Sequence, residues 1–154
     1  MKSDFSDFPV YDVPEVAGLA ERIEGHLNRG ILVLSNEADN ATGPDNFLSK
    51  ILSAVNIDQE KATGLLLLNE QESCWLAPLL NLLNIRYLLS FGIPPSQLGI
   101  HIGATLYQPV VINELTIMWA DPLSVIRQTR EAGDPRRAGA LWKAMQQIFP
   151  VKEG

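Results

Sequence analysis

The chain has 154 residues, is 46% hydrophobic and carries a formal net charge of −6. This length fits one globular domain, and the acidic balance argues against strong direct binding of nucleic acid, because Lys and Arg supply most non-specific affinity for phosphates. No apolar run reaches the roughly 18 residues that span a bilayer, and the acidic, aromatic N-terminus does not predict a signal peptide, so we expect a cytoplasmic protein without membrane contacts.

The chain divides into an arm and a domain. Residues 1–13 predict a flexible N-terminal arm, because their aromatic side chains follow no helical period. Residues 14–154 predict a single α/β domain. A helix is expected from Pro14 toward Gly30, because a proline suits a first helical turn and a glycine suits a helix end. Its apolar stripe consists of Val16, Leu19, Ala20, Ile23 and Leu27.

Three short apolar runs follow, and each predicts a strand that is buried on both faces, as in parallel sheets. They are "ILVLSN" at 31–36, "GLLLLN" at 64–69 and "RYLLSFG" at 86–92. A helix that begins at Pro44 is expected between the first two strands. A second helix, over residues 75–84, is expected between the last two. Residues 93–99 predict a turn or a single helical turn.

The C-terminal part predicts two more strands and two helices. The segments 105–112 and 115–120 are the candidate strands. Asp121 is the expected N-cap of the first helix, with a proline at the next position. Asp134 repeats that start signal before the last helix. One face of the last helix collects Ala138, Leu141, Trp142, Met145 and Ile148.

Strands that alternate with helices predict a three-layer α/β domain with a mostly parallel central sheet. In such sheets a functional site lies beyond the carboxyl ends of the strands. Those ends fall at residues 35–40, 69–72, 91–95 and 120–124. They predict a pocket that five polar residues would line, namely Asn36, Glu37, Asn69, Asp121 and Ser124.

The content and order of these strand ends resemble the uracil-DNA glycosylase family. That family has a "VVILGQDPY" strand end with a catalytic Asp, a "GVLLLN" strand whose Asn reads uracil, a "FLLWG" strand and a final "HPSPLS". Here "ILVLSNEADN", "GLLLLN", "LLSFG" and "WADPLS" stand in that order. The resemblance implies a uracil-DNA-glycosylase-like fold. If activity were retained, it would place the water-activating carboxylate at Glu37 and the uracil-reading amide at Asn69.

The departures from that family argue against catalysis. Glu37 is one methylene longer than the family's Asp, and the residues that shape its loop are missing. Ala120 and Asp121 stand where the final motif has its His. A negative Asp121 would oppose, rather than stabilise, the anionic uracil leaving group. We therefore expect no catalytic activity, with a divergent glycosylase that uses Glu37 and Asn69 as the alternative.

More of the chain resembles the psi subunit of bacterial DNA polymerase III, a family with this fold but without the activity. That pattern includes "LVMVAND", a "DPLVSDVLRAL" helix, "SPDQ", "SPALTDLR" and an "NPTARAALWQQI" helix. Here "ILVLSNEADN", "GPDNFLSKILSAV", "NIDQEKA", "ADPLSVIRQ" and "DPRRAGALWKAMQQIF" follow in the same order. The resemblance implies a non-catalytic accessory subunit of the replicative polymerase that bridges the clamp loader to another protein.

In psi subunits the corresponding arm docks on the clamp-loader ATPase collar. A short apolar motif on an acidic arm is a common form of docking peptide. Phe5, Phe8 and Tyr11 are the expected contact residues. The partners implied are clamp-loader subunits and a chi-like protein. Two alternatives remain, in which the arm folds back on its own domain or the chain is an unrelated α/β protein-interaction module.

The remaining candidate residues favour structural roles. Glu37, Asp39 and Asp45 lie in one loop, where solvated or helix-capping carboxylates are a better expectation than a metal site. The single cysteine excludes an internal disulfide, and no Cys/His spacing indicates zinc. We therefore expect no metal and no cofactor. Core positions are expected for the three tryptophans, a half-buried position for His101 and a buried, inert thiol for Cys74.

Overall fold

The structure is a computed structural model, and it describes residues 14–43, 46–69, 72–100 and 103–150. It is an α/β fold built on one six-stranded mixed sheet with the strand order β1-β3-β2-β4-β6-β5. The expected arm, with Phe5, Phe8 and Tyr11, lies outside the described residues. The same holds for Asp45 and His101.

The bounds of the sheet strands are β1 Glu24–Gly25, β2 Ile31–Ser35, β3 Thr63–Leu67, β4 Tyr87–Phe91, β5 Val110–Ile112 and β6 Leu115–Ala120. The four central strands run parallel, since β2 pairs in parallel with both β3 and β4, and β4 pairs in parallel with β6. Both edge strands, β1 and β5, run antiparallel to their neighbours. The expected α/β class is confirmed, and the sheet is a mixed one with a parallel centre and antiparallel edges.

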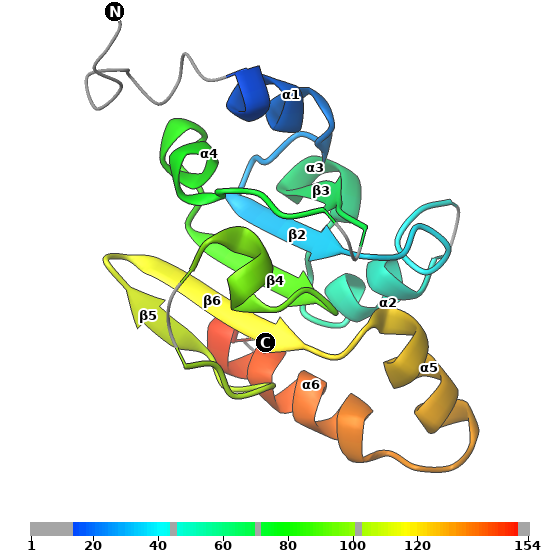
Figure 1. The fold of residues 1–154 in the computed structure, drawn as a ribbon. Helices are drawn as coiled ribbons and strands as arrows, with labels where there is room; N and C mark the ends of the chain where they lie inside the picture. Colours follow the sequence, from blue (N-terminus) through cyan, green and yellow to red (C-terminus); the bar gives the residue numbers. More distant parts are fainter. Residues whose placement is uncertain (1–13, 44–45, 70–71, 101–102, 151–154) are drawn as a thin grey trace, which may run out of the picture.

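Helices cover both faces of this sheet (Figure 1). They are α1 Pro14–Glu21, α2 Phe47–Ser53, α3 Gln59–Ala62, α4 Ala77–Leu82, η3 Pro95–Leu98 (a 3-10 helix), α5 Leu123–Glu131 and α6 Arg136–Ile148. Side chains of α2, α5 and α6 share one core cluster with one face of the sheet, and those of α1, α4 and η3 share a second cluster with the other face. The strands are buried on both faces because alternate residues enter each cluster.

The expected helix from Pro14 toward Gly30 is wrong in its second half, because α1 ends at Glu21 and the chain then forms the edge strand β1. Ile23 and Leu27 still pack against the core, but from the non-helical segment around β1, which lies on Gly64. A Cβ built on Gly64 would lie 2.6 Å from Ile23 Cγ2 and 2.7 Å from Leu27 Cδ2. The apolar period therefore indicated burial correctly, whereas the bare backbone of Gly64 selected a different local structure.

Two helix starts also differ from expectation. The helix expected to begin at Pro44 begins at Phe47 instead, with Asn46 as its N-cap, and Asn46 Oδ1 accepts a hydrogen bond of 2.8 Å from the Ser49 N–H. Asp121 does not cap α5, whose N-cap position is held by Pro122 without a side-chain hydrogen bond. In the described part of the chain, no helix is long and apolar enough to cross a bilayer.

Candidate functional site

The carboxyl ends of the four central strands meet at one edge of the sheet. Ser35 of β2 is in register with both Leu67 of β3 and Phe91 of β4, and Phe91 is in register with Ala120 of β6. This arrangement brings the loops that carry the five expected pocket residues to the same edge. It is the position at which α/β sheets commonly hold a ligand.

At this edge the Glu37 carboxylate caps a helix. Its Oε1 accepts a hydrogen bond of 2.8 Å from the backbone N–H of Ser124, in the first turn of α5. The buried Ser35 hydroxyl fixes the Glu37 backbone, because it donates to the Glu37 carbonyl at 2.9 Å and accepts from the Glu37 N–H at 3.0 Å. A carboxylate at a helix N-terminus satisfies a free N–H and is favoured by the helix dipole. Glu37 and Ser124 are thus in direct contact.

A second contact joins the same loop to α5. Arg127 Nη1 donates to Asn40 Oδ1 at 3.0 Å, and Arg127 also pairs with Glu131. Asn40 is 8% exposed, so its amide oxygen needs a protein donor at this depth. The first part of the loop after β2 is therefore held against α5 at two positions.

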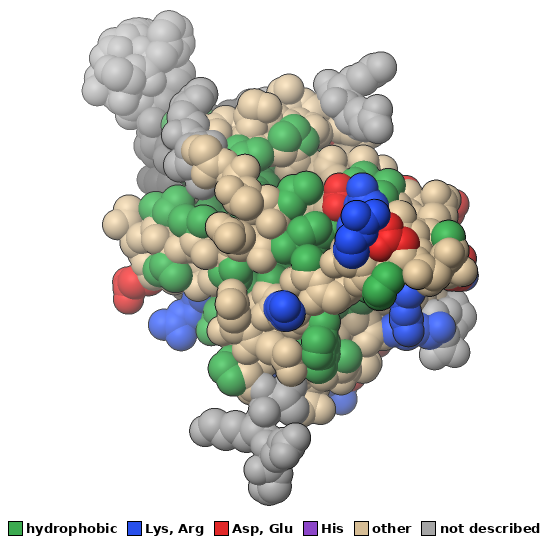
Figure 2. Space-filling model, turned by 90° about the horizontal axis from the view of Figure 1, so that it is seen from below, with side chains coloured by type: hydrophobic (Ala, Val, Ile, Leu, Met, Phe, Trp, Pro, Cys, Tyr) green, Lys and Arg blue, Asp and Glu red, His purple; other side chains and the backbone are tan. Residues whose placement is uncertain are grey.

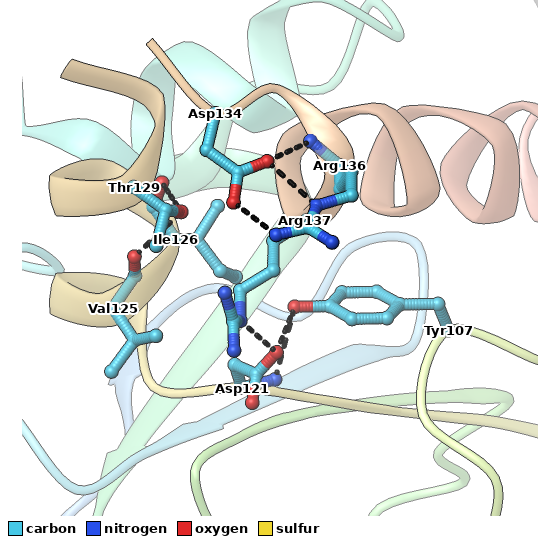
Figure 3. Close-up of polar contacts among 8 residues, drawn as sticks. All are labelled: Tyr107, Asp121, Val125, Ile126, Thr129, Asp134, Arg136 and Arg137. Atoms are coloured by element: carbon cyan, nitrogen blue, oxygen red, sulfur yellow. Dashed lines mark hydrogen bonds and ion pairs between the residues drawn. The ribbon is translucent and has the colours of Figure 1, made fainter. Parts of the chain in front are cut away.

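The Asp121 carboxylate receives two donors from distant parts of the chain (Figure 3). The Tyr107 hydroxyl donates to Asp121 Oδ2 at 2.6 Å, and Arg137 Nε donates to the same oxygen at 3.1 Å. Tyr107 is anchored in turn, because its N–H donates to the Trp119 carbonyl at 2.7 Å. Asp121 therefore ties the end of β6 to the segment before β5 and to the first turn of α6.

This environment changes the acidity of the tyrosine. Burial, together with the hydrogen bond to the Asp121 carboxylate, raises the pKa of Tyr107 well above its ordinary value. The folded protein therefore keeps Tyr107 neutral where an unfolded chain would ionise it. Its stabilising contribution is fully present below about pH 10, the unfolded pKa, and is lost as the pH rises through the higher folded pKa.

Tyr107→Phe is therefore expected to remove a late-ionising tyrosine from the alkaline titration. Tyrosinate absorbance should show a phase that begins above the ordinary tyrosine range of about pH 10 in the native protein and is missing in Tyr107→Phe. The free energy of unfolding should also fall less steeply above about pH 10 in Tyr107→Phe than in the native protein. Tyr87→Phe is the control and should leave the late phase in place. A late phase of unchanged size in Tyr107→Phe would contradict this assignment.

The other two expected pocket residues lie apart from these contacts. Asn69 is exposed, and its backbone carbonyl accepts from Gln97 Nε2 at 2.8 Å. Asn36 packs beside Gly92, and its Oδ1 is buried without a hydrogen-bond partner among the described residues. An exposed salt bridge between Arg22 and Glu72 flanks Asn69. Its hydrogen bond lowers the pKa of Glu72.

The five residues therefore share an edge of the sheet. None of five cavities delineated between described residues, each of about 410–530 Å³, is lined by Asn36, Glu37, Asn69, Asp121 or Ser124. Over the described ranges, no group of three His, Cys, Asp or Glu residues is placed to hold a metal ion. In the described structure, Glu37 ties the loop after β2 to α5, and Asp121 ties the end of β6 to α6.

The core prediction for tryptophan is confirmed only for Trp119, which is 2% exposed. Trp75 and Trp142 are 58% and 41% exposed, so their expected core positions are wrong. Cys74, expected to be buried, is partly exposed. Trp142 lies on the α6 stripe, but it borders a groove between α6, α5 and α2 that the helical period alone does not reveal. The view from below, toward α6, shows hydrophobic patches with Lys and Arg side chains among them (Figure 2).

No model of a protein family matches the chain, and no curated protein matches it.

Proposed function

We propose that the chain is a non-catalytic, psi-like accessory subunit of the bacterial replicative DNA polymerase III, with a uracil-DNA-glycosylase-like fold. In this role it acts in the cytoplasm and bridges the clamp loader to another protein, for which a chi-like protein is the candidate. The proposal rests on the order of sequence segments that resemble psi subunits, from "ILVLSNEADN" to "DPRRAGALWKAMQQIF". The described fold is compatible with it.

The proposal that the chain is not an enzyme rests on the contacts of two carboxylates at the strand ends, Glu37 and Asp121. Glu37 Oε1 is held by the Ser124 N–H, and Asp121 Oδ2 is held by Tyr107 and Arg137. A general base needs a free lone pair directed at its water. Here Glu37 Oε1 is engaged in helix capping and Asp121 Oδ2 in an ion pair, and this structural use of both carboxylates supports the non-catalytic proposal. The same contacts fix α5 and α6 on the sheet, which suits a scaffold for protein partners.

The test of the proposed function is binding to a purified bacterial clamp loader. We expect the full chain to elute with the clamp loader in size-exclusion chromatography and to elute alone when the clamp loader is omitted. Absence of any complex at concentrations of about 10 μM, where moderate protein interactions of roughly −8 kcal/mol are half-formed or better, would contradict the proposal.

The enzyme alternative makes a different prediction, on uracil release. We expect no detectable release from single-stranded or double-stranded DNA, because loss of one charge-stabilising donor alone costs on the order of 100 to 1,000-fold, and Asp121 adds an opposing charge. The assay is cleavage of abasic sites in a labelled uracil-containing strand. Robust excision that disappears in Glu37→Ala but persists in Asp39→Ala would establish the glycosylase alternative instead.

A further inference from the structure

The strongest unassigned feature is an apolar groove between α2, α5 and α6, called here the α2–α6 groove. It has a volume of about 500 Å³, within the range of roughly 300–1,000 Å³ that is usual for ligand sites. Its wall carries Ile51 of α2 and, on α6, Leu141, Trp142 and Met145. Trp142 leaves 41% of its surface exposed here. A large aromatic side chain in such a position is a frequent anchor for a partner.

The backbone of α6 keeps the groove open beside this tryptophan. Gly139 precedes Trp142 by three residues, so it lies on the same face of the helix. A Cβ built on Gly139 would meet no atom within 4 Å. The helix surface is therefore open at Gly139, beside Trp142.

The charge of the lining selects the chemistry of the occupant. The whole chain has 18 acidic and 12 basic residues, yet the lining contains Lys50 and Arg130 and no carboxylate. Both cations are exposed, and neither forms an ion pair within the part of the chain that the structure describes. Arg127, which lies near Lys50 and Arg130, is by contrast paired with Glu131. Two cations without ion-pair partners beside the apolar lining of the groove complement a negatively charged segment with large apolar side chains.

We propose that the α2–α6 groove docks a short acidic segment of a partner protein, with Leu or Phe side chains seated against Trp142 and carboxylates paired with Lys50 and Arg130. Such a surface would receive the second protein that the proposed bridging function requires. The groove proposal rests on that proposed function, but its experiment omits the clamp loader. A negative result for the groove therefore leaves the clamp-loader contact untouched, and the reverse also holds.

The probe is a fluorescein-labelled peptide in which Asp residues alternate with Leu and Phe, titrated with the full chain and followed by fluorescence polarisation. We expect the peptide to bind, and to bind at least about ten-fold more weakly when every Asp is replaced by Lys or every Leu and Phe by Ala, since affinity here needs both charge and anchors. No binding of the acidic peptide, or equal binding of the three peptides, would overturn the proposal.

Matched variants locate the binding surface. Trp142→Ala should weaken binding by about thirty-fold, the effect typical of a central aromatic anchor, whereas Trp75→Ala, at the other strongly exposed tryptophan, should have no effect. The double variant Lys50→Glu/Arg130→Glu should also lose binding, with Lys143→Glu as the control on α6 outside the groove. Gly139→Leu offers a blocking variant that fills the groove with a good helix former. Equal affinity in Trp142→Ala and Trp75→Ala would overturn the assignment.

Two other occupants give distinct results. If deletion of residues 1–13 strengthens peptide binding, the chain's own arm competes for the groove and the partner assignment is wrong. If the full chain sediments as a dimer that Trp142→Ala dissociates, a second copy is the occupant. A monomer whose peptide affinity is unchanged by the deletion supports a partner in trans.

Discussion

Deletion of residues 1–13 is expected to abolish capture of the clamp loader while the α/β domain keeps its fold. The expectation rests on three aromatic residues spaced by three positions, Phe5, Phe8 and Tyr11, on an acidic arm. Pro9 prevents a helix from continuing smoothly through them. Aromatic anchors in a small interface commonly carry about 2 kcal/mol or more each, so loss of all three should reduce affinity below detection.

The domain should tolerate this deletion because its described core begins after the arm. Leu19 is the first core residue among those whose burial is described, and α1 begins at Pro14. A thermal melt of the truncated protein should therefore stay close to that of the full chain. A pull-down with purified clamp loader measures the binding, and deletion of residues 151–154 is the matched control at the other terminus.

Two results would contradict this prediction in different ways. Undiminished binding of the truncated protein would remove the arm as the docking element and leave the clamp-loader assignment intact. Failure of the full chain to bind would remove the psi-like assignment itself. Replacement of Phe5, Phe8 and Tyr11 by Ala in the full-length arm separates the anchors from arm length and should lose binding as completely as the deletion.

Strand positions and burial were predictable because they depend on local apolar runs. The run 31–36 became β2, buried at every position, and the segment 115–120 became β6 with the expected bounds. The turn expected at 93–99 contains the 3-10 helix η3. In each case the hydrophobic pattern agrees with the tertiary environment, so local and global preferences point to the same structure.

The features that the sequence did not predict depend on residues far apart in the chain. Glu37 caps a helix 87 positions later, so the aspartate–proline signal at Asp121 indicated where α5 begins but not which residue caps it. The edge strand β1 forms because Gly64 leaves room for Ile23 and Leu27. Helical period placed Trp142 on the core stripe without showing that the neighbouring helices leave it half-covered. These three features depend on strand register and on how helices pack together. Neither can be predicted from a short stretch of sequence.

The sharpest test of the strand-end geometry is Gly92→Ala, which is expected to destabilise the domain. Gly92 follows β4 and has φ +81, and a Cβ there would lie 2.8 Å from Asn36 Oδ1 and 2.9 Å from Pro122 Cγ. A left-handed backbone costs a residue with a Cβ about 1–2 kcal/mol, and a methyl forced into packed surroundings adds about 1–3 kcal/mol. The backbone cannot simply relax, because the Gly92 N–H donates to the Ala120 carbonyl at 2.9 Å.

Two control glycines separate the backbone contribution to the loss of stability from the contribution of steric clashes. Gly133 has φ +92 but no atom within 4 Å of a built Cβ, so Gly133→Ala should show only the backbone cost of about 1–2 kcal/mol. Gly139 lies inside α6 with open space around it, and Gly139→Ala should stabilise the helix by up to about 1 kcal/mol. Chemical denaturation of the three variants measures these differences. If Gly92→Ala costs no more than Gly133→Ala, the close approach of the Asn36 loop and Pro122 to the end of β4 is wrong, and with it the placement of the loops at this edge of the sheet.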